Sequence, residues 1–237
     1  SPLSRLYNKA YEDTNFSCLR EVFDKDLEGD KPLASKRWIF LWQDDMGEAG
    51  AFMVCSRVGS SLICYPNFGL PNALLFTDAR GLIGLLSFVY SSFIANFESI
   101  EFSVPGHMDL TALLPELSSM EYIPVLNGMA RAVNAETLLK LCKCRGEGEL
   151  VIRVTDGILP ENNDTFALSF APGRDNRVER TSSAPQITMD AGDLAVLLGG
   201  ARESRSIELS PGITLYDSGA PLEQVFYRKP CQVLDLF

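Results

Sequence analysis

Two cysteines separated by one residue, Cys142 and Cys144, are the first candidates for chemistry in this sequence. A Cys-x-Cys pair could bind a metal ion if further cysteines or histidines stood at a suitable spacing. The sequence has one histidine, His107, and no second cysteine pair at a zinc-like spacing. We therefore expect no metal site. His107 follows Pro105-Gly106 in an expected loop, and nothing near it in the sequence supports a nucleophilic cysteine–histidine pair.

Acidic and aromatic residues near position 40 allow two interpretations each. Asp44 and Asp45, with Glu48, could line a pocket for a cation, but a solvated turn is the simpler interpretation of this short polar stretch. Trp38, Phe40 and Trp42 could form an aromatic cage for a substrate, but such residues are more typical of a core or of contacts between subunits. We favour the turn and the core.

The composition is that of an acidic globular protein. The chain has 237 residues, enough for one large domain or for two of about 100 to 130 residues. The formal charge is −10, from 31 acidic and 21 basic residues. This balance argues against nucleic acid as a partner, because phosphate binding needs a basic surface. It is compatible with a cationic substrate, and equally with an acidic surface that serves solubility alone.

The cysteines and the apolar segments bear on the cellular compartment. Six cysteines are spread through the chain, and we find neither a secreted-type disulfide framework nor a signal peptide. We therefore expect free thiols and a cytoplasmic protein. The longest apolar run, residues 81–97, contains serines and an asparagine and is shorter than the roughly 20 residues that a membrane-spanning helix needs. It predicts a buried helix and no membrane span.

The elements predicted in the first half indicate a layered α/β domain. Alternating apolar residues predict strands over 37–43, 51–56, 61–65 and 99–104, and the first three form an antiparallel meander. Helical spacing predicts helices over 3–11, 19–27, 77–96 and 108–117. The helix that begins at Thr77-Asp78 is apolar nearly all round, so we expect it to be covered on both sides. This order of elements is that of an acetyltransferase-type layer.

The second half predicts another α/β domain, which contains a hairpin with a long polar turn. Strands are predicted over 127–133, 150–154, 166–170, 177–181 and 186–189. Helices are predicted over 135–143, after an Asn134 cap, from the Asp190 cap to Gly199-Gly200, and over 222–227. Within the hairpin, Phe166, Leu168 and Phe170 share one face.

Several short motifs of the second half, in this order, resemble the C-terminal region of the Eis (enhanced intracellular survival) family of N-acetyltransferases. They are Met129-Ala-Arg-Ala-Val-Asn134, Gly148-Glu-Leu-Val-Ile-Arg-Val-Thr-Asp156, Pro160-Glu-Asn162, Val178-Glu-Arg180, and Asp190 followed by Gly199-Gly200. The chain also ends on a phenylalanine, as that family does. The resemblance extends over nearly the whole chain, although the first half matches by layout only.

The resemblance implies a three-part enzyme: an N-terminal domain that binds acetyl-CoA, a central GNAT-like domain without the cofactor loop, and a domain like sterol carrier protein 2 (SCP2). The present sequence is similar to the last two parts. We expect an α/β (α+β) chain with a GNAT-like domain over 1–126 and an SCP2-like domain over 127–237. No stretch offers the Arg/Gln-x-x-Gly-x-Gly/Ala loop that would hold a pyrophosphate. Acetyl-CoA is therefore expected to bind an upstream domain, and this fragment alone to be inactive.

The resemblance also implies a role for the C-terminus. In the Eis family the terminal carboxylate is implicated in accepting a proton from the substrate amine, which gives that role to Phe237 here. An ammonium must lose a proton before its nitrogen can attack a thioester, and a partly desolvated carboxylate gains basicity. Asp235 would add negative potential for a cationic amine. From the residues alone, Phe237 could instead pack or belong to a frayed terminus.

Two functions from different classes follow. The first is the central and C-terminal part of an Eis-like, acetyl-CoA-dependent N-acetyltransferase of primary amines, such as an aminoglycoside or a lysine, in the trimer or hexamer that the family forms. The alternative is a non-catalytic binding or scaffold module with an SCP2-like apolar ligand pocket. An upstream reading frame of about 150 residues, one typical domain, with the CoA loop would favour the enzyme.

Overall fold

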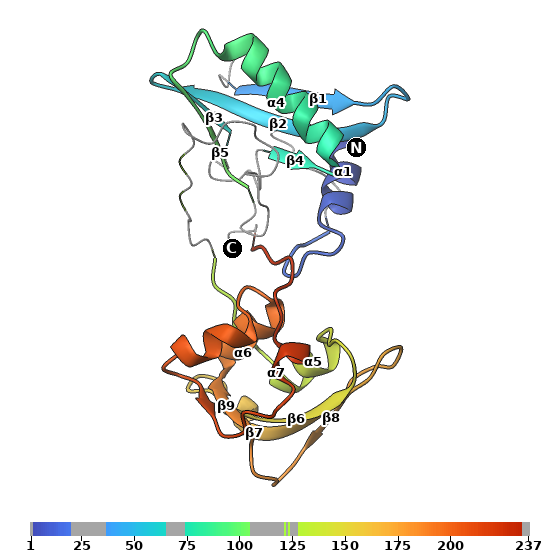
Figure 1. Ribbon diagram of the computed structural model, residues 1–237, viewed down its shortest axis with the longest axis vertical. Coiled ribbons are helices and arrows are strands. Elements are labelled where there is room, and N and C mark those ends of the chain that lie inside the picture. Colours follow the sequence, from blue (N-terminus) through green and yellow to red (C-terminus); the bar gives the residue numbers. More distant parts are fainter. Residues whose placement is uncertain are drawn as a thin grey trace. The chain divides into compact units, whose positions relative to one another are not determined.

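The computed structural model describes residues 2–19, 37–64, 74–104, 121, 123 and 128–233. The chain forms two compact units that divide between residues 126 and 127 (Figure 1). They are called here the N-terminal and the C-terminal unit. The helices predicted over 19–27 and 108–117 lie outside the described residues, apart from Leu19, which is not helical. In the part of the chain that is described, no helix is long and apolar enough to cross a membrane.

A five-stranded sheet forms the N-terminal unit. Its strands are β1 (Arg37–Gln43), β2 (Ala49–Val58), β3 (Ser61–Cys64), β4 (Leu74–Phe76) and β5 (Ser99–Phe102). The first three form the predicted antiparallel meander, and β5 pairs in parallel with β3. Strand β4, which pairs with β2, was not predicted, because three residues are too few to show an alternating pattern.

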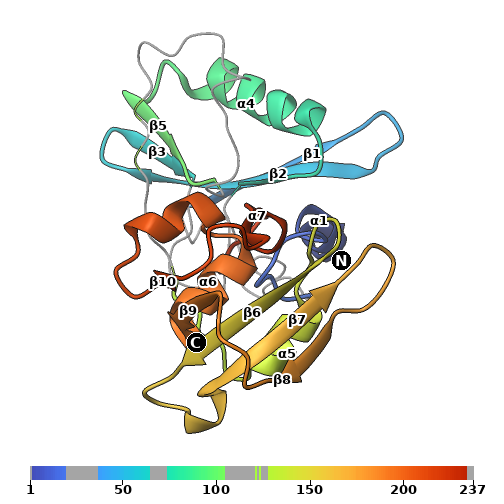
Figure 2. The same ribbon diagram turned by 60° about the horizontal axis from the view of Figure 1, so that its bottom comes forward.

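Strand β2 is buried on both faces of this sheet. Because successive side chains of a strand point to opposite faces, Phe52 and Val54 contact helix α1 (Pro2–Ala10). Met53 and Cys55 lie on the other face, in the cluster that includes helix α4 (Ala79–Phe93). Figure 2 shows the two helices on opposite sides of the β1–β2 sheet. The unit is therefore a layered α/β domain, as the sequence predicts, with helices on both faces of the β1–β2 sheet.

Helix α4 begins at the predicted cap and packs very closely on the sheet. The Asp78 carboxylate accepts a hydrogen bond from the Gly81 N–H at 2.9 Å. A Cβ atom placed on Gly84 would lie 2.4 Å from Trp42 Nε1, so the indole fits only against a glycine. The prediction that α4 is covered on both sides is wrong for the residues described, because Tyr90 and Ile94 are exposed.

The C-terminal unit has its own five-stranded sheet. Its strands are β6 (Gly148–Thr155), β7 (Asp164–Phe170), β8 (Arg177–Arg180), β9 (Ile187–Asp190) and β10 (Thr214–Leu215). The order across the sheet is β10-β9-β6-β7-β8. The predicted hairpin is β6–β7, with Leu150 opposite Leu168 and Ile152 opposite Phe166. Only the β6–β9 pair of this sheet is parallel.

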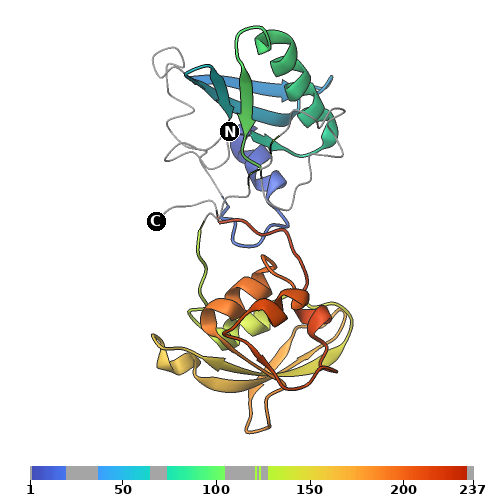
Figure 3. The same ribbon diagram turned by 60° about the vertical axis from the view of Figure 1, so that its left-hand side comes forward.

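The helices of the C-terminal unit cover one face of its sheet. They are α5 (Ala135–Leu141), α6 (Ala191–Gly199) and α7 (Leu222–Val225). Figure 3 shows the yellow-green and orange helices on one side of the sheet, while the other side carries no helix. Strand β6 alternates accordingly, with Leu150, Ile152 and Val154 fully buried and the residues between them partly or fully exposed. This is the alternation expected of a sheet with one covered face.

Both helix caps predicted in this unit are present. Asn134 Oδ1 accepts a hydrogen bond from the Thr137 N–H at 2.8 Å at the start of α5. Asp190 caps α6, and Gly200 ends that helix with a φ of 84°, in the left-handed region that glycine adopts without strain.

Two predicted elements of this unit are wrong in kind or length. Residues 128–133 form no strand. Their backbone bonds to other partners, since the Ala132 N–H donates to the Ala191 carbonyl at 3.2 Å and the Ala132 carbonyl accepts from Asn162. The last helix, predicted over 222–227, ends at Val225. The segment over 206–209, which has an ambiguous pattern, belongs to a 3₁₀ helix, Ser204–Leu209.

Candidate functional site

One edge of the C-terminal sheet collects polar residues from separate parts of the sequence. Strands β6 and β9 are parallel, and Thr155 lies opposite Asp190 where both strands end. The residues that follow two parallel strands meet at the same edge, where ligands often bind in α/β proteins. A cavity of about 430 Å³ lies there, lined by Arg131, Thr155, Asp156, Gly157, Ile158, Asn163 and Asp190.

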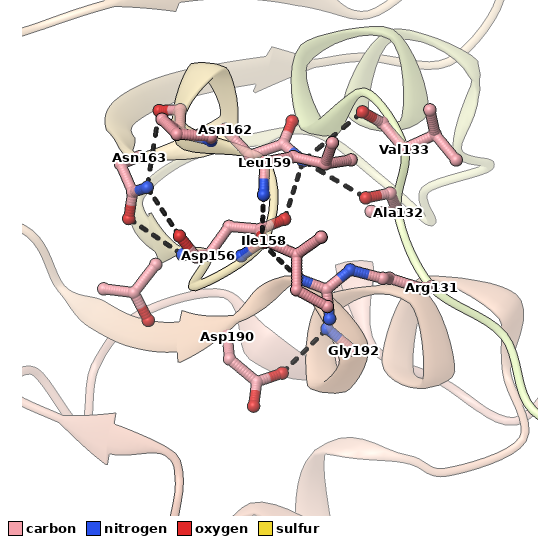
Figure 4. Close-up of polar contacts among 12 residues, drawn as sticks. Arg131, Ala132, Val133, Asp156, Ile158, Leu159, Asn162, Asn163, Asp190 and Gly192 are labelled. Carbon is pink, nitrogen blue, oxygen red and sulfur yellow. Dashed lines mark hydrogen bonds and ion pairs between the residues drawn. The ribbon is translucent and has the colours of Figure 1, made fainter.

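Asp156 is the centre of the polar contacts at this edge (Figure 4). Its Oδ1 atom accepts hydrogen bonds from the Ile158 and Leu159 N–H groups, each at 2.8 Å. The same atom pairs with the guanidinium of Arg131, and Oδ2 accepts from Asn162 Nδ2 at 2.9 Å. The side chain of Asp156 is fully buried. Each carboxylate oxygen therefore has a partner that favours the ionised form.

These contacts fix the protonation state of Asp156. The hydrogen bond from Asn162 has the largest effect, followed by the Leu159 N–H, and together with Ile158 and Arg131 they hold the pKa of Asp156 well below its usual range. A general acid or base needs a pKa near the working pH. Asp156 is therefore an anion that organises the backbone, and it is not a proton-transfer group at neutral pH.

Asn162 and Asn163 connect this carboxylate to the rest of the unit. Asn162 is 2% exposed, and its Oδ1 accepts from the Ala135 N–H at 2.9 Å, at the start of α5. Asn163 Oδ1 accepts from the Asp156 N–H at 2.8 Å, and its Nδ2 donates to the Asp156 carbonyl at 2.7 Å. We call Arg131, Asp156, Asn162 and Asn163 the Asp156 cluster. It closes the turn between β6 and β7 and joins that turn to α5.

The other carboxylate of the cavity also bonds to backbone. Asp190 Oδ1 accepts from the Gly192 and Asp193 N–H groups, each at 2.7 Å. Asp190 Oδ1 thus caps α6, while Asp156 is held as an anion. Because Arg131 is already paired to Asp156, the lining of the cavity suits at most a small polar ligand.

The two residues predicted to act on the substrate, Phe237 and Asp235, lie outside the described residues, as does His107. Their roles stay predictions. The described chain ends at Val233, close to Gly128, where an added Cβ would lie 2.7 Å from Val233 Cβ.

The acidic and aromatic candidates near position 40 have structural contacts. Asp44 Oδ1 accepts from the Met46 and Glu48 N–H groups, each at 2.9 Å, which makes the stretch a turn. Trp38 and Trp42 pack against the buried cluster under α4. The turn and the core that we favour are therefore the arrangements that the structure has.

Cys142 and Cys144 lie just after α5, with their Sγ atoms 3.7 Å apart. Asn176 and Lys229 approach them from distant parts of the sequence, as Asn176 Nδ2 is 3.4 Å from Cys142 Sγ and Lys229 acts electrostatically on both thiols. Among the described residues, no group of three or more His, Cys, Asp and Glu side chains could hold a metal ion. Sequence reasoning missed Asn176 and Lys229, because no spacing links them to the cysteine pair.

Residues 135–230 match the family described as a sterol carrier protein domain. The match spans the C-terminal unit from α5 to α7. A comparison with curated proteins finds no match.

Solved structures similar to this chain include two that are named as an N-acyltransferase or an N-acetyltransferase, and Eis1. A conserved protein of unknown function from Enterococcus faecalis V583, named a probable N-acyltransferase, has a TM-score of 0.76 at 15% identity; the match covers 97% of this chain and 58% of that protein. A GCN5-related N-acetyltransferase from Anabaena variabilis has a TM-score of 0.71 at 17% identity, and the match covers 98% of this chain and 58% of that protein. Eis1 from Mycobacterium abscessus has a TM-score of 0.60 at 16% identity, and the match covers 76% of this chain and 46% of that protein.

At these identities the likeness shows the fold. The chain combines a GNAT-like α/β layer with a sterol-carrier-like domain, as predicted. It spans 58% or less of the length of the three solved proteins.

Proposed function

We propose that this chain is the central and C-terminal part of an Eis-like N-acetyltransferase that transfers acetyl from acetyl-CoA to a primary amine. The observation that carries the proposal is the extent of the structural match. Two proteins named as acyl- or acetyltransferases each match 97% or more of this chain in a single alignment, so they share both of its units in the same order.

The proposal divides the work between this chain and a further domain that binds acetyl-CoA. The solved relatives contain additional chain that could supply it, since the match covers 58% of their length. The first turn of α4 supports this division. Helix N-termini bind phosphates through free N–H groups and a positive dipole, but here the Asp78 carboxylate accepts from Gly81 N. Its negative charge would also repel a pyrophosphate.

A first test uses the complete reading frame, including any coding sequence before Ser1. We expect this protein to acetylate an aminoglycoside or a lysine peptide in the presence of acetyl-CoA, measured as the acetylated product by mass spectrometry. The 237-residue chain alone should neither bind acetyl-CoA in calorimetry nor form product. Tight acetyl-CoA binding by the 237 residues would overturn the division of work. A lipid retained in native mass spectrometry, without any acetylation, would instead favour the non-catalytic binding module.

A second test addresses the proposed proton acceptor, the terminal carboxylate of Phe237. A few Gly-Ser residues added after Phe237 should lower kcat, because the carboxylate is moved away from the amine. The same residues added at the N-terminus are the matched control and should leave kcat unchanged. Asp235→Asn should raise KM for a polycationic amine more than it lowers kcat. The change removes a negative charge that attracts the amine, but it leaves the Phe237 carboxylate in place as the base. Unchanged activity in the C-terminally extended enzyme would remove Phe237 from the mechanism.

A further inference from the structure

The end of helix α5 carries a pair of partly buried cysteines near basic side chains. Cys142 is the residue that ends α5, and its backbone is already extended, with φ −66° and ψ 140°. The Sγ atoms of Cys142 and Cys144 are 3.7 Å apart, and both residues are partly accessible to solvent. A disulfide needs the two sulfur atoms at about 2.05 Å. Both cysteines lie beyond the last helical residue of α5. Rotation of their side chains can therefore bring the two sulfur atoms most of the way together.

A buried lysine acts electrostatically on this pair. Lys229 is 7% exposed, and its ammonium donates to the Leu198 carbonyl at 2.9 Å and the Val225 carbonyl at 3.5 Å. The ring of Tyr227 lies 4.4 Å from the same nitrogen. Within the described part of the chain, no carboxylate pairs with Lys229. Lys229 therefore has no described carboxylate to neutralise it, and it acts electrostatically on both thiols, although burial lowers the pKa of Lys229 itself.

Asn176 completes the surroundings of the pair. Its Nδ2 donates to the Cys142 carbonyl at 2.7 Å and lies 3.4 Å from Cys142 Sγ and 3.9 Å from Cys144 Sγ. The other titratable or charged groups that act here are Tyr227 and Arg145, whose guanidinium lies 3.9 Å from the Tyr227 ring centre, and Lys143, which acts on Lys229. Among the described residues, no acidic side chain contributes to the electrostatics of either thiol.

The two thiols differ in acidity. A hydrogen bond from Cys142 has the largest effect on Cys144, and with Lys229 and Asn176 it lowers the pKa of Cys144 despite the burial that opposes it. The pKa of Cys142 is raised, because its proton is shared with Cys144 and its thiol is desolvated. The thiolate is thus favoured on Cys144 over Cys142. This is the division between an attacking and a resolving cysteine.

We propose that Cys142 and Cys144 form a redox-active dithiol that is oxidised to an intramolecular disulfide by low-molecular-weight disulfides, with Cys144 as the attacking and Cys142 as the resolving thiol. Lys229 is a positioning residue that stabilises the Cys144 thiolate. In the first step, the thiolate of Cys144 attacks a small disulfide RSSR, which gives a Cys144–SR mixed disulfide and RS⁻. In the second step, Cys142 loses its proton to RS⁻ and attacks Cys144 Sγ, releasing the second RS⁻. Counted from the dithiol, whose Cys144 proton has passed to solvent before the first step, the protein gives up two electrons and two protons. The second RS⁻ takes up a proton from solvent, so RSSR becomes two RSH.

A second thiol pair in the same chain provides the control. Cys55 and Cys64 lie on neighbouring strands β2 and β3 with their Sγ atoms 2.7 Å apart, closer than those of Cys142 and Cys144. Both are completely buried in the apolar cluster under α4, and the hydrogen bond that Cys64 shares with Cys55, together with burial, raises the pKa of Cys64. If closeness alone decided reactivity, this pair would react first. Solvent access to Cys142 and Cys144, and the charge of Lys229, predict instead that this pair reacts before Cys55 and Cys64.

The experiment treats the fully reduced chain with oxidised glutathione as the probe and follows each cysteine by peptide mass spectrometry. We expect loss of two hydrogen atoms from the peptide that contains Cys142 and Cys144, before any change at Cys55 or Cys64. Cys142→Ser should stop the reaction at a glutathione adduct on Cys144. Cys144→Ser should slow glutathione addition on the order of tenfold, because the attacking thiol is gone and the remaining Cys142 thiol is desolvated. The double variant Cys55→Ser with Cys64→Ser should leave the product unchanged.

The pH dependence separates the role of Lys229 from a purely structural one. In the Cys142→Ser background, the rate of adduct formation should rise with pH through a pKa below that of a free cysteine. The added change Lys229→Met should shift this profile to higher pH and leave the rate at alkaline pH unchanged. The circular dichroism spectrum reports whether that variant is folded. Oxidation of Cys55 and Cys64 first, or an adduct in Cys142→Ser that forms mainly on the exposed Cys18, would overturn the proposal whatever the Lys229 variant does.

Discussion

The two units fill their interiors with different kinds of side chain. In the N-terminal unit, β2 is covered by helices on both faces, and Ser4 is the single buried polar residue among those described. The C-terminal unit covers one face of its sheet with helices, yet its described part buries Asp156, Asn162, Thr165, Ser210 and Lys229. Apolar layers specify a fold through volume and shape. Buried polar groups specify it through particular partners, because an unmatched group is costly.

The thiol pairs show the same contrast on a smaller scale. Cys55 and Cys64 are part of an apolar core and act there as small hydrophobic side chains. Cys142 and Cys144 lie beside a buried cation and a side-chain amide donor. Reactive groups are thus concentrated in the unit whose interior already accommodates charge.

The largest effect is expected from Asp156→Ala. This change leaves the Ile158 and Leu159 N–H groups and the Asn162 amide without their acceptor, and it removes the partner of Arg131. We expect the melting temperature of the C-terminal unit to fall by roughly 10 °C or more, since several buried donors lose their partner at once.

The measurement can separate the units, because both tryptophans, Trp38 and Trp42, belong to β1. Tryptophan fluorescence therefore reports the N-terminal unit, while far-ultraviolet circular dichroism reports both. Asp156→Ala should shift the dichroism transition and leave the fluorescence transition in place. Asp164→Ala is the matched control, since this carboxylate is partly exposed in its pair with Arg180, and it should change the melting temperature little. If both changes lowered the melting temperature equally, the Asp156 cluster would not stabilise the unit more than an exposed ion pair does.

Much of both folds could be predicted from local patterns. Strand β6 alternates buried and exposed residues along a β-branched run, and Asn134 and Asp190 cap helices as their residue types suggest. These features depend on neighbours within a few residues. Strand β4 could not be predicted, because its pairing with β2 across more than twenty residues, and not its own three, defines it.

The candidate sites depend on contacts that no local pattern contains. Residues 128–133 carry the apolar character of a strand, but their backbone bonds to Asn162 and to Ala191. Lys229 looks like an ordinary surface lysine in the sequence, and burial beside Cys142 and Cys144 follows only from the packing of the C-terminal segment against Gly200. Chain topology, not residue type, brings these groups together.

The next largest effect is expected in the N-terminal unit from Gly84→Ala. The new Cβ would lie 2.4 Å from Trp42 Nε1, so the helix and the indole must separate. Overpacking of this kind costs about 1–3 kcal/mol, and the better helix propensity of alanine offsets up to about 1 kcal/mol of it. We expect a lower fluorescence transition in urea with the dichroism of the C-terminal unit unaffected.

Two variants control for the helix propensity and for the contact. Ser92→Ala, on an exposed position of α4, should leave the stability unchanged or raise it slightly. Trp42→Phe should reduce the cost of Gly84→Ala, because the smaller ring leaves room for the methyl group. If Gly84→Ala lowered the free energy of unfolding as much in the Trp42→Phe background as in the parent protein, contact with the indole would not be the cause of the loss.

A smaller effect is expected on the acid sensitivity of the C-terminal unit. The folded pKa of Asp156 lies below its ordinary value, so its stabilisation is complete above about pH 4 and is lost as the pH falls from there towards the folded pKa. Asp156→Asn should therefore lower stability at neutral pH and flatten the decline below about pH 4. Urea unfolding followed by dichroism at several pH values measures this slope. A variant slope as steep as that of the parent protein would assign the acid sensitivity to other carboxylates.

The smallest effect is expected from an ion pair on the surface of the same unit. Arg177 Nη2 lies 2.6 Å from Glu179 Oε1, closer than most such pairs, but the two side chains are 77% and 60% exposed. Solvent and salt screen such a pair, and exposed pairs contribute about 0–1 kcal/mol. Arg177→Ala should therefore change the free energy of unfolding by less than about 1 kcal/mol, with a difference that shrinks further in high salt. A loss as large as that of Asp156→Ala would mean that short charge contacts stabilise this unit wherever they lie, and that burial of the Asp156 carboxylate does not set it apart.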